Sequence, residues 1–136
     1  MEFFRKIDVS TDQQGIINTG QFKNLDRLSS QLFLLETLNE HQAAIGSLWG
    51  EFTLTRQEIK GGLRFSLLEC PNALTWTITT GYEPAPDSVM VHLTINRTEK
   101  DQEFLEEIKD FVDDHGKHLK QAFDSKSNAA ATNVDY

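Results

Sequence analysis

The side chains best suited to metal or acid–base chemistry lie close together near the C-terminal end of the chain. Asp114 and His118 are four residues apart, a spacing that puts both on one face of a helix, and His115 lies between them. A carboxylate and an imidazole can bind a divalent cation, but a site on a helix needs a third ligand from another element. His92 is one candidate, and strand alternation places it on the far side of the predicted sheet. We therefore predict no metal and no cofactor, and we interpret His115 as a side chain at the margin of the core.

The common patterns of a catalytic centre are missing. The single cysteine, Cys70, lies in a predicted turn next to Glu69, whose negative charge disfavours the reactive thiolate. No G-x-S-x-G motif is present, and the glycines lack the spacing of a phosphate-binding loop. These observations favour a protein without catalytic residues, with an Asp- or His-based metalloenzyme as the weakest alternative.

Acidic residues are concentrated in one segment of the chain. Residues 99–114 contain eight Asp or Glu against two Lys, and the whole chain has a formal net charge of −8. Such a charge disfavours nucleic acid and anionic membranes as partners. The segment is either a docking face for a basic protein or a solvated helix face whose carboxylates complement the helix dipole. The docking candidates are Glu103, Glu106, Glu107, Asp110, Asp113 and Asp114.

Between Leu48 and Asn96 the alternation of apolar and polar residues predicts four successive β-strands. The inward stripes are Leu48, Phe52 and Leu54; Leu63, Phe65 and Leu67; Leu74, Trp76 and Ile78; and Val89, Val91, Leu93 and Ile95. The expected pairs across the three turns are Lys60 with Leu63, Phe65 with Trp76, and Thr80 with Val89. Each register keeps apolar residues on one side, so the strands should form one antiparallel meander.

Two helices should cover the apolar side of this sheet. Apolar residues at spacings of three and four predict a helix over residues 21–44, with Gly46 near its end. A second helix begins near Thr98 to Asp101, which resembles a capping box, and Gly116 could end or kink it. The segment 3–9 could be a short strand or a helical turn, and residues 124–136 should be a disordered tail. The predicted fold is therefore α+β in two layers: a four-stranded antiparallel meander in the order α-β-β-β-β-α, within a single domain of residues 1–123.

The two sides of the predicted sheet offer two kinds of site. The outer side is rich in threonine, and its interface candidates are Trp49, Arg64, Leu68, Met90 and His92. The inner side could form a pocket under the helices, lined by Phe52, Phe65, Trp76 and Phe111. Ordinary close packing of these aromatic rings as a core is the simpler interpretation.

These observations predict a small, acidic, cytoplasmic and non-enzymatic protein-interaction module, such as an adapter, a chaperone-like protein or a self-associating domain. The partner would be another protein or a second copy of the chain, with no nucleic acid and no membrane. The alternative function is binding of a small apolar ligand between the sheet and the helices. The sequence offers no stretch of about 20 apolar residues that could cross a bilayer.

Overall fold

The computed structural model describes residues 1–70, 73–82, 86–96 and 102–134, with side chains described as far as Phe123. The elements are β1 (Glu2–Ile7), α1 (Gln13–Thr19), the 3-10 helix η1 (Phe22–Asn24), α2 (Leu25–Leu28), β2 (Leu32–Thr37), β3 (Gln42–Ser47), β4 (Gly50–Ile59), β5 (Gly62–Leu67), β6 (Thr75–Thr80), β7 (Val89–Thr94) and α3 (Gln102–Val134).

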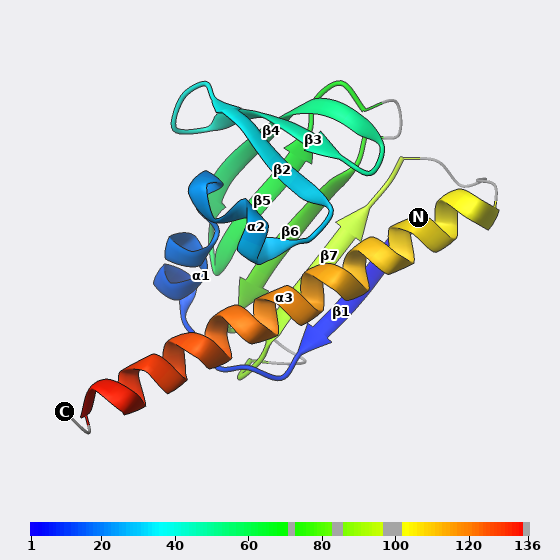
Figure 1. Cartoon of the computed structure of the whole chain (residues 1–136). Coiled ribbons are helices and arrows are strands. Elements are labelled where there is room, and N and C mark those ends of the chain that lie inside the picture. The colour runs from blue at the N-terminus through cyan, green and yellow to red at the C-terminus, as the bar shows by residue number, and fades with distance from the viewer. Residues whose placement is uncertain (71–72, 83–85, 97–101, 135–136) are drawn as a thin grey trace.

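The seven strands of the described residues form one antiparallel sheet in the order β1-β7-β6-β5-β4-β3-β2, so β1 and β2 are its edges. The long helix α3 crosses the sheet and packs against β1, β7 and α2, whereas α1 contacts β5 and β6 (Figure 1). The predicted α+β fold with a C-terminal helix and an antiparallel sheet is confirmed. The predicted number of four strands is wrong, because three more strands flank the meander.

The predicted meander corresponds to β4, β5, β6 and β7, which pair in sequence order. Phe65 lies opposite Trp76 and Thr80 lies opposite Val89, as the alternation predicts. The predicted inward residues of β5, β6 and β7 are all buried. Period-2 alternation therefore gave the inner face of these three strands correctly.

The turn between β4 and β5 differs from the prediction. Ile59 pairs with Gly62, so the two turn residues are Lys60 and Gly61, and the expected pair of Lys60 with Leu63 is wrong. Gly61 has a φ of +87°, which favours glycine. A Cβ at Gly62 would lie 1.9 Å from the backbone oxygen of Ile78 on β6. The second glycine is therefore needed for close strand packing and belongs to β5.

The predicted helix over residues 21–44 is also wrong. Leu25 and Leu28 are buried on the short helix α2, and Ser29 takes an extended conformation that ends it. The chain then enters β2, where Leu32 is buried and every following residue to Thr37 is exposed. The spacing of the leucines in this region resembles that of an amphipathic helix. Because β2 is an edge strand, however, its leucines are not buried with that period. Gly46, predicted to follow the helix, lies in β3.

The β3–β4 turn changes the placement of two predicted residues. Ser47 pairs with Gly50, which leaves Leu48 and Trp49 as turn residues outside the strand alternation. Leu48 is exposed instead of facing inward. Trp49 packs against the core instead of lying on the outer side of the sheet. Both placements were wrong because the strand begins two residues later than predicted.

Helix α3 continues through Gly116, which neither ends nor kinks it. A Cβ at this glycine would lie 3.0 Å from Cγ of Arg5, so its absence lets β1 approach the helix closely. The backbone of α3 extends to Val134. The proposed capping box at Thr98 to Asp101 lies outside the described residues. No helix within the described part of the chain is long and apolar enough to span a bilayer.

Candidate functional site

Six aromatic side chains make contact between α3 and the sheet. We call Trp49, Phe65, Trp76, Phe104, Phe111 and His115 the ring cluster. Phe111 lies at its centre: its ring centroid is 5.3 Å from that of Trp76, 5.6 Å from Trp49 and 5.8 Å from His115. The rings come from α3, β5, β6 and the β3–β4 turn, so the fold assembles them from distant parts of the sequence.

Local structure explains why these rings meet. Phe111 and His115 are four residues apart on α3 and therefore share one face of the helix. Trp76 is held by its pairing with Phe65, whose ring stacks on it at 5.4 Å. Trp49 is held by its turn, where its backbone nitrogen donates a hydrogen bond to Ser47 Oγ at 3.1 Å.

Three nitrogen atoms of the ring cluster are buried without a hydrogen-bond partner among the described residues. They are Nε1 of Trp49, Nε1 of Trp76 and Nε2 of His115. Trp76 and His115 are almost completely inaccessible to solvent, with exposed fractions of 2% and 0%. Leaving a buried polar group unpaired costs about 1–3 kcal/mol, and such groups are uncommon in native proteins. Three of them around one phenylalanine distinguish this region from an ordinary apolar core.

The protonation state of His115 follows from its single hydrogen bond. Its Nδ1 lies 2.5 Å from the backbone oxygen of Leu28, and a carbonyl oxygen only accepts, so Nδ1 carries the hydrogen. Burial lowers the pKa of His115 to about 4, although the Leu28 carbonyl and the nearby Asp114 favour the charged form. The imidazole is therefore neutral at pH 7, and its Nε2 is an unprotonated acceptor that points into the interior.

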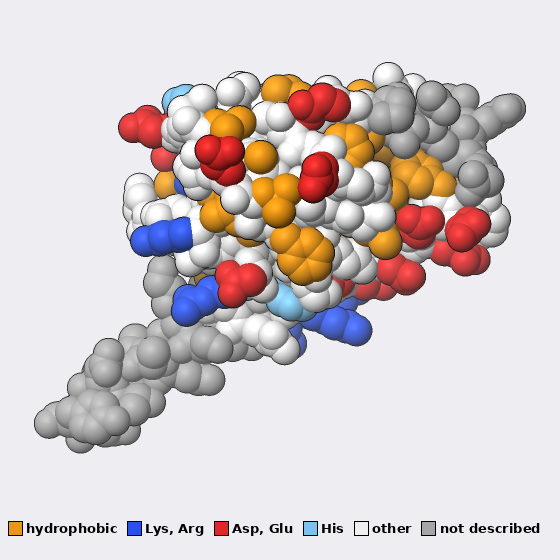
Figure 2. All heavy atoms as spheres, turned by 45° about the horizontal axis from the view of Figure 1, so that its top comes forward, with side chains coloured by type: hydrophobic (Ala, Val, Ile, Leu, Met, Phe, Trp, Pro, Cys, Tyr) orange, Lys and Arg blue, Asp and Glu red, His pale blue; other side chains and the backbone are white. Residues whose placement is uncertain are grey.

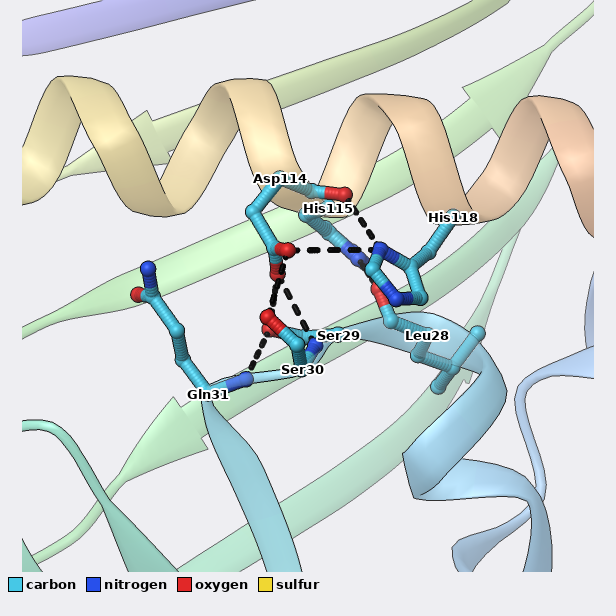
Figure 3. Close-up of polar contacts among 7 residues, drawn as sticks. All are labelled: Leu28, Ser29, Ser30, Gln31, Asp114, His115 and His118. Carbon is cyan, nitrogen blue, oxygen red and sulfur yellow. Dashed lines mark hydrogen bonds and ion pairs between the residues drawn. The ribbon is translucent and has the colours of Figure 1, made fainter.

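Asp114, the neighbour of His115 on α3, has a very different environment. One carboxylate oxygen accepts hydrogen bonds from Ser29 Oγ at 2.6 Å and from the backbone nitrogen of Ser30 at 3.0 Å. The other accepts from Ser30 Oγ at 2.7 Å and lies 3.3 Å from Nδ1 of His118. Figure 3 shows these contacts joining α3 to the segment between α2 and β2. We call Ser29, Ser30, Asp114 and His118 the Asp114 cluster.

The Asp114 cluster favours an ionised carboxylate. Burial is the largest single effect and would raise the pKa of Asp114. Hydrogen bonds from Ser29 and Ser30, together with the neighbouring His118, outweigh burial and hold this pKa below its ordinary value. A carboxylate that accepts three hydrogen bonds in this way is a structural anchor. In the described part of the chain, no group of three or more His, Cys, Asp or Glu side chains could hold a metal ion.

The other acidic candidates on α3 do not form one compact site. Glu103, Glu106 and Asp110 are exposed, and Glu107 is half-buried. Asp113 pairs with Arg5 of β1, with 3.1 Å between Oδ1 and Nη1, and both side chains are largely exposed. The predicted docking face therefore includes one residue that anchors the fold and one in a surface ion pair, and its role in binding stays a prediction.

The remaining interface candidates lie apart from the ring cluster. Arg64 and His92 flank Thr77 on the outer side of the sheet, and Met90 lies on the same side. The ring of Phe4 stacks on His92 at 4.3 Å, and Nε2 of His92 lies 3.1 Å from Oε1 of Glu2. Leu68 is exposed just after β5. The expected interface on this side stays a prediction.

Of the predicted pocket residues, Phe65, Trp76 and Phe111 belong to the ring cluster, and Phe52 is half-buried against the core. Two open hollows on the surface have different linings. One of about 440 Å³ lies between the start of α1 and the β4–β5 turn, next to Tyr82. Another of about 770 Å³ is lined by residues of the β2–β3 turn and β4, including His41 and Arg56. Neither hollow includes a predicted pocket residue.

Sequence reasoning missed Ser29 and Ser30. The predicted helix over residues 21–44 puts both in a helix interior, where their hydroxyl groups have no special role. The signal that could have found them is the Ser-Ser pair itself, because serine favours helix ends over helix interiors. Their partner Asp114 is 84 or 85 residues away in the sequence, and no local pattern connects them.

The fold resembles several solved structures of low sequence identity. The protein XoxI from Bacillus cereus has 16% identity and a TM-score of 0.61, covering 90% of this chain and 94% of the other. An uncharacterised protein from Bacillus thuringiensis has 16% identity and a TM-score of 0.61, covering 90% and 97%. A START superfamily protein from Mycobacterium smegmatis has 10% identity and a TM-score of 0.58, covering 91% and 97%. No protein-family model and no curated protein matches the chain.

The chain therefore has an α+β fold with a C-terminal helix and a large antiparallel sheet, as these solved structures indicate. These identities are too low to transfer an activity, so the likeness establishes the fold alone. It agrees with a layout in which a long C-terminal helix covers one side of a large antiparallel sheet (Figure 1).

Proposed function

We propose that this protein binds a small apolar molecule between α3 and the sheet, against the ring cluster. The observation that carries the proposal is the set of three buried ring nitrogens around Phe111 that find no partner in the described residues. A core that only stabilises the fold gains nothing from such atoms, since each costs free energy when it is left unpaired. A ligand that enters this region would recover that cost and would bury its own apolar surface.

The likeness to solved structures supports this function more than a protein-interaction module. START-like proteins have a fold that typically binds apolar ligands. The aromatic rings of the ring cluster also favour an apolar ligand, because Trp and Phe side chains offer a large contact area with few rotatable bonds. The function first expected from the sequence as the alternative is therefore the better supported one.

Native mass spectrometry and calorimetry test the proposal. Protein purified from its expression host without organic solvents should retain a small molecule, or should bind naphthalene as an apolar probe in a calorimetric titration. The Met90→Ala variant is the matched control, since Met90 lies on the outer side of the sheet, and it should bind naphthalene unchanged. A bare chain that also gives no heat with naphthalene would rule out the proposed function.

A separate observation favours self-association as a second function. The edge strand β2 exposes Phe33 and Leu35, with exposed fractions of 60% and 55%, and Leu34 is partly exposed beside them. Apolar and acidic side chains alternate over this end of the molecule (Figure 2). An exposed apolar edge strand can pair with the same strand of a second copy and extend the sheet. This surface differs from the outer sheet side that the sequence suggested.

Light scattering coupled to size-exclusion chromatography tests this second function. The chain should elute as a dimer, and Phe33→Glu should convert it to a monomer by placing a charge in the paired edge. Leu48→Glu is the control, because Leu48 is an exposed apolar residue in the β3–β4 turn. A wild-type monomer at all concentrations would exclude self-association through β2.

A further inference from the structure

We propose that the ligand of the ring cluster carries an uncharged hydroxyl group, which binds between Trp76 and His115. This inference rests on the proposed function and adds the chemical class of the ligand: an apolar molecule with an alcohol or phenol group. It depends on the kinds of hydrogen-bonding atoms that the two rings present.

Trp76 and His115 offer complementary hydrogen-bonding atoms. The indole Nε1 of Trp76 can only donate, and Nε2 of neutral His115 can only accept. The two rings are in contact, with centroids 6.2 Å apart and planes at 84° to each other. Both side chains are buried, so bulk water does not reach either atom.

A hydroxyl group matches this pair better than neutral groups that only accept hydrogen bonds, because one oxygen atom both accepts and donates. Its oxygen can accept the hydrogen of Trp76 Nε1 while its own hydrogen is donated to Nε2 of His115. A ketone or an ether could accept from Trp76 but would leave His115 unpaired. A pure hydrocarbon would leave both atoms unpaired and would not offset the cost of burying them.

The charges near the pair disfavour an anionic ligand. Trp76 is neutral, and the neighbouring rings of Phe65 and Phe111 carry no charge. Burial keeps His115 neutral at pH 7, and the closest ionised group on its helix is the carboxylate of Asp114. A carboxylate entering this region would lose its hydration without gaining a cation, which is a large cost. The ring cluster should therefore reject fatty or aromatic acids.

Calorimetric titration at pH 7 with three probes of similar shape tests the proposal. The probes are naphthalene, 2-naphthol and 2-naphthoate, which present no polar group, an uncharged hydroxyl and a carboxylate. We expect 2-naphthol to bind about tenfold more tightly than naphthalene, the effect of one or two well-placed buried hydrogen bonds. The carboxylate should bind more weakly than naphthalene.

Two matched variants locate the preference. Trp76→Phe keeps an aromatic ring and removes the donor, so the preference for 2-naphthol over naphthalene should fall, with only the hydrogen bond to His115 left. Trp49→Phe removes the other unpaired indole nitrogen of the ring cluster, and there the preference should persist. If Trp76→Phe does not fold, the three probes on the wild-type protein still decide the question.

The outcomes separate this inference from the proposed function. Binding of naphthalene and 2-naphthol with equal affinity would overturn the hydroxyl preference and leave apolar binding intact. Tighter binding of 2-naphthoate would overturn it in favour of a cationic site. Failure of all three probes to bind would count against the proposed function itself.

Discussion

Two neighbouring residues on α3 have opposite polar environments. The carboxylate of Asp114 accepts three hydrogen bonds from Ser29 and Ser30 and lies beside His118. The imidazole of His115 is entirely buried and hydrogen-bonds Leu28, and its Nε2 has no partner within the described part of the chain. One turn of α3 thus contributes to one cluster whose carboxylate is fully hydrogen-bonded and to another that contains buried polar atoms without partners among the described residues.

The two clusters should therefore have different roles: the Asp114 cluster stabilises the fold, and the ring cluster binds the proposed ligand. In the Asp114 cluster the three hydrogen bonds that the carboxylate accepts join α3 to the segment before β2, so removing a partner should cost stability. In the ring cluster the unpaired atoms contribute nothing favourable to the fold, so removing one should cost little stability and should change ligand recognition. Buried polar groups that a fold tolerates without partners are candidates for function.

The largest expected effect is a loss of unfolding free energy at acidic pH. Unfolded histidine takes up a proton near pH 6.5, whereas folded His115 does so only near pH 4, so the unfolded state binds more protons between these values. The free energy of unfolding should therefore fall by roughly 3 kcal/mol between pH 7 and pH 4 because of this residue. Asp114 and His118 act on the pKa of His115 in opposite directions, Asp114 raising it and His118 lowering it. Denaturant unfolding at a series of pH values measures the loss.

A control variant isolates the contribution of His115. His115→Asn keeps an N–H donor near Leu28 but cannot titrate, so its unfolding free energy should depend less on pH between 6.5 and 4. The lowered pKa of Asp114 acts below this range, since its stabilisation is lost only as the pH falls through the folded value. Parallel pH profiles for the wild type and His115→Asn would show that His115 is not buried in the neutral form.

The second effect should come from the Asp114 cluster. Asp114→Ala removes the acceptor of three hydrogen bonds and leaves the buried Ser29 hydroxyl hydrogen without that acceptor, so we expect a loss of about 2 kcal/mol in unfolding free energy. Asp110→Ala is the control, because Asp110 is exposed on the same helix, and it should change stability by less than about 0.5 kcal/mol. Equal stabilities for the two variants would remove the anchoring role.

A smaller effect should follow from the unpaired donor of the ring cluster. Trp76→Phe loses some packing volume but also removes an unsatisfied N–H, and the two changes act in opposite directions. Its unfolding free energy should stay within about 1 kcal/mol of the wild type. A loss as large as that of a fully paired buried group would indicate that Nε1 has a partner in the folded protein.

The smallest effect should belong to the surface pair of Arg5 and Asp113. Both side chains are largely exposed, and exposed ion pairs contribute little. Asp113→Ala should lower the unfolding free energy by about 0.5 kcal/mol, and less at high salt. Asp113 and Asp114 are adjacent acidic residues, so both variants remove one negative charge from the same place. The difference between their unfolding free energies therefore measures the contribution of the hydrogen bonds of Asp114.

The parts of the fold that could be predicted are those where burial follows a regular period. Strands β5 to β7 bury alternate residues, and the pairs Phe65 with Trp76 and Thr80 with Val89 followed from that alternation. Residues 21–44 could not be predicted in this way. Leu32 is buried while Leu34 and Leu35 are exposed on an edge strand, so hydrophobicity and burial do not coincide there.

The candidate site was predictable only in its parts. The sequence placed Phe65, Trp76 and Phe111 on facing inner surfaces, because each belongs to a regular strand or helix stripe. It placed Trp49 on the wrong side, since a turn residue does not follow strand alternation. The unpaired nitrogens could not be predicted, because a hydrogen-bond partner depends on the three-dimensional neighbours of an atom and not on the local pattern.

The most direct test of the account is an NMR titration of 15N-labelled protein with 2-naphthol and, separately, with naphthalene. The indole N–H signal of Trp76, identified with Trp76→Phe, and the Nε2 signal of His115 report the two unpaired atoms. We predict that 2-naphthol moves both signals in the direction of hydrogen bonding, whereas naphthalene does not. Unchanged signals for both atoms in protein saturated with 2-naphthol would contradict the claim that these ring nitrogens bind the ligand.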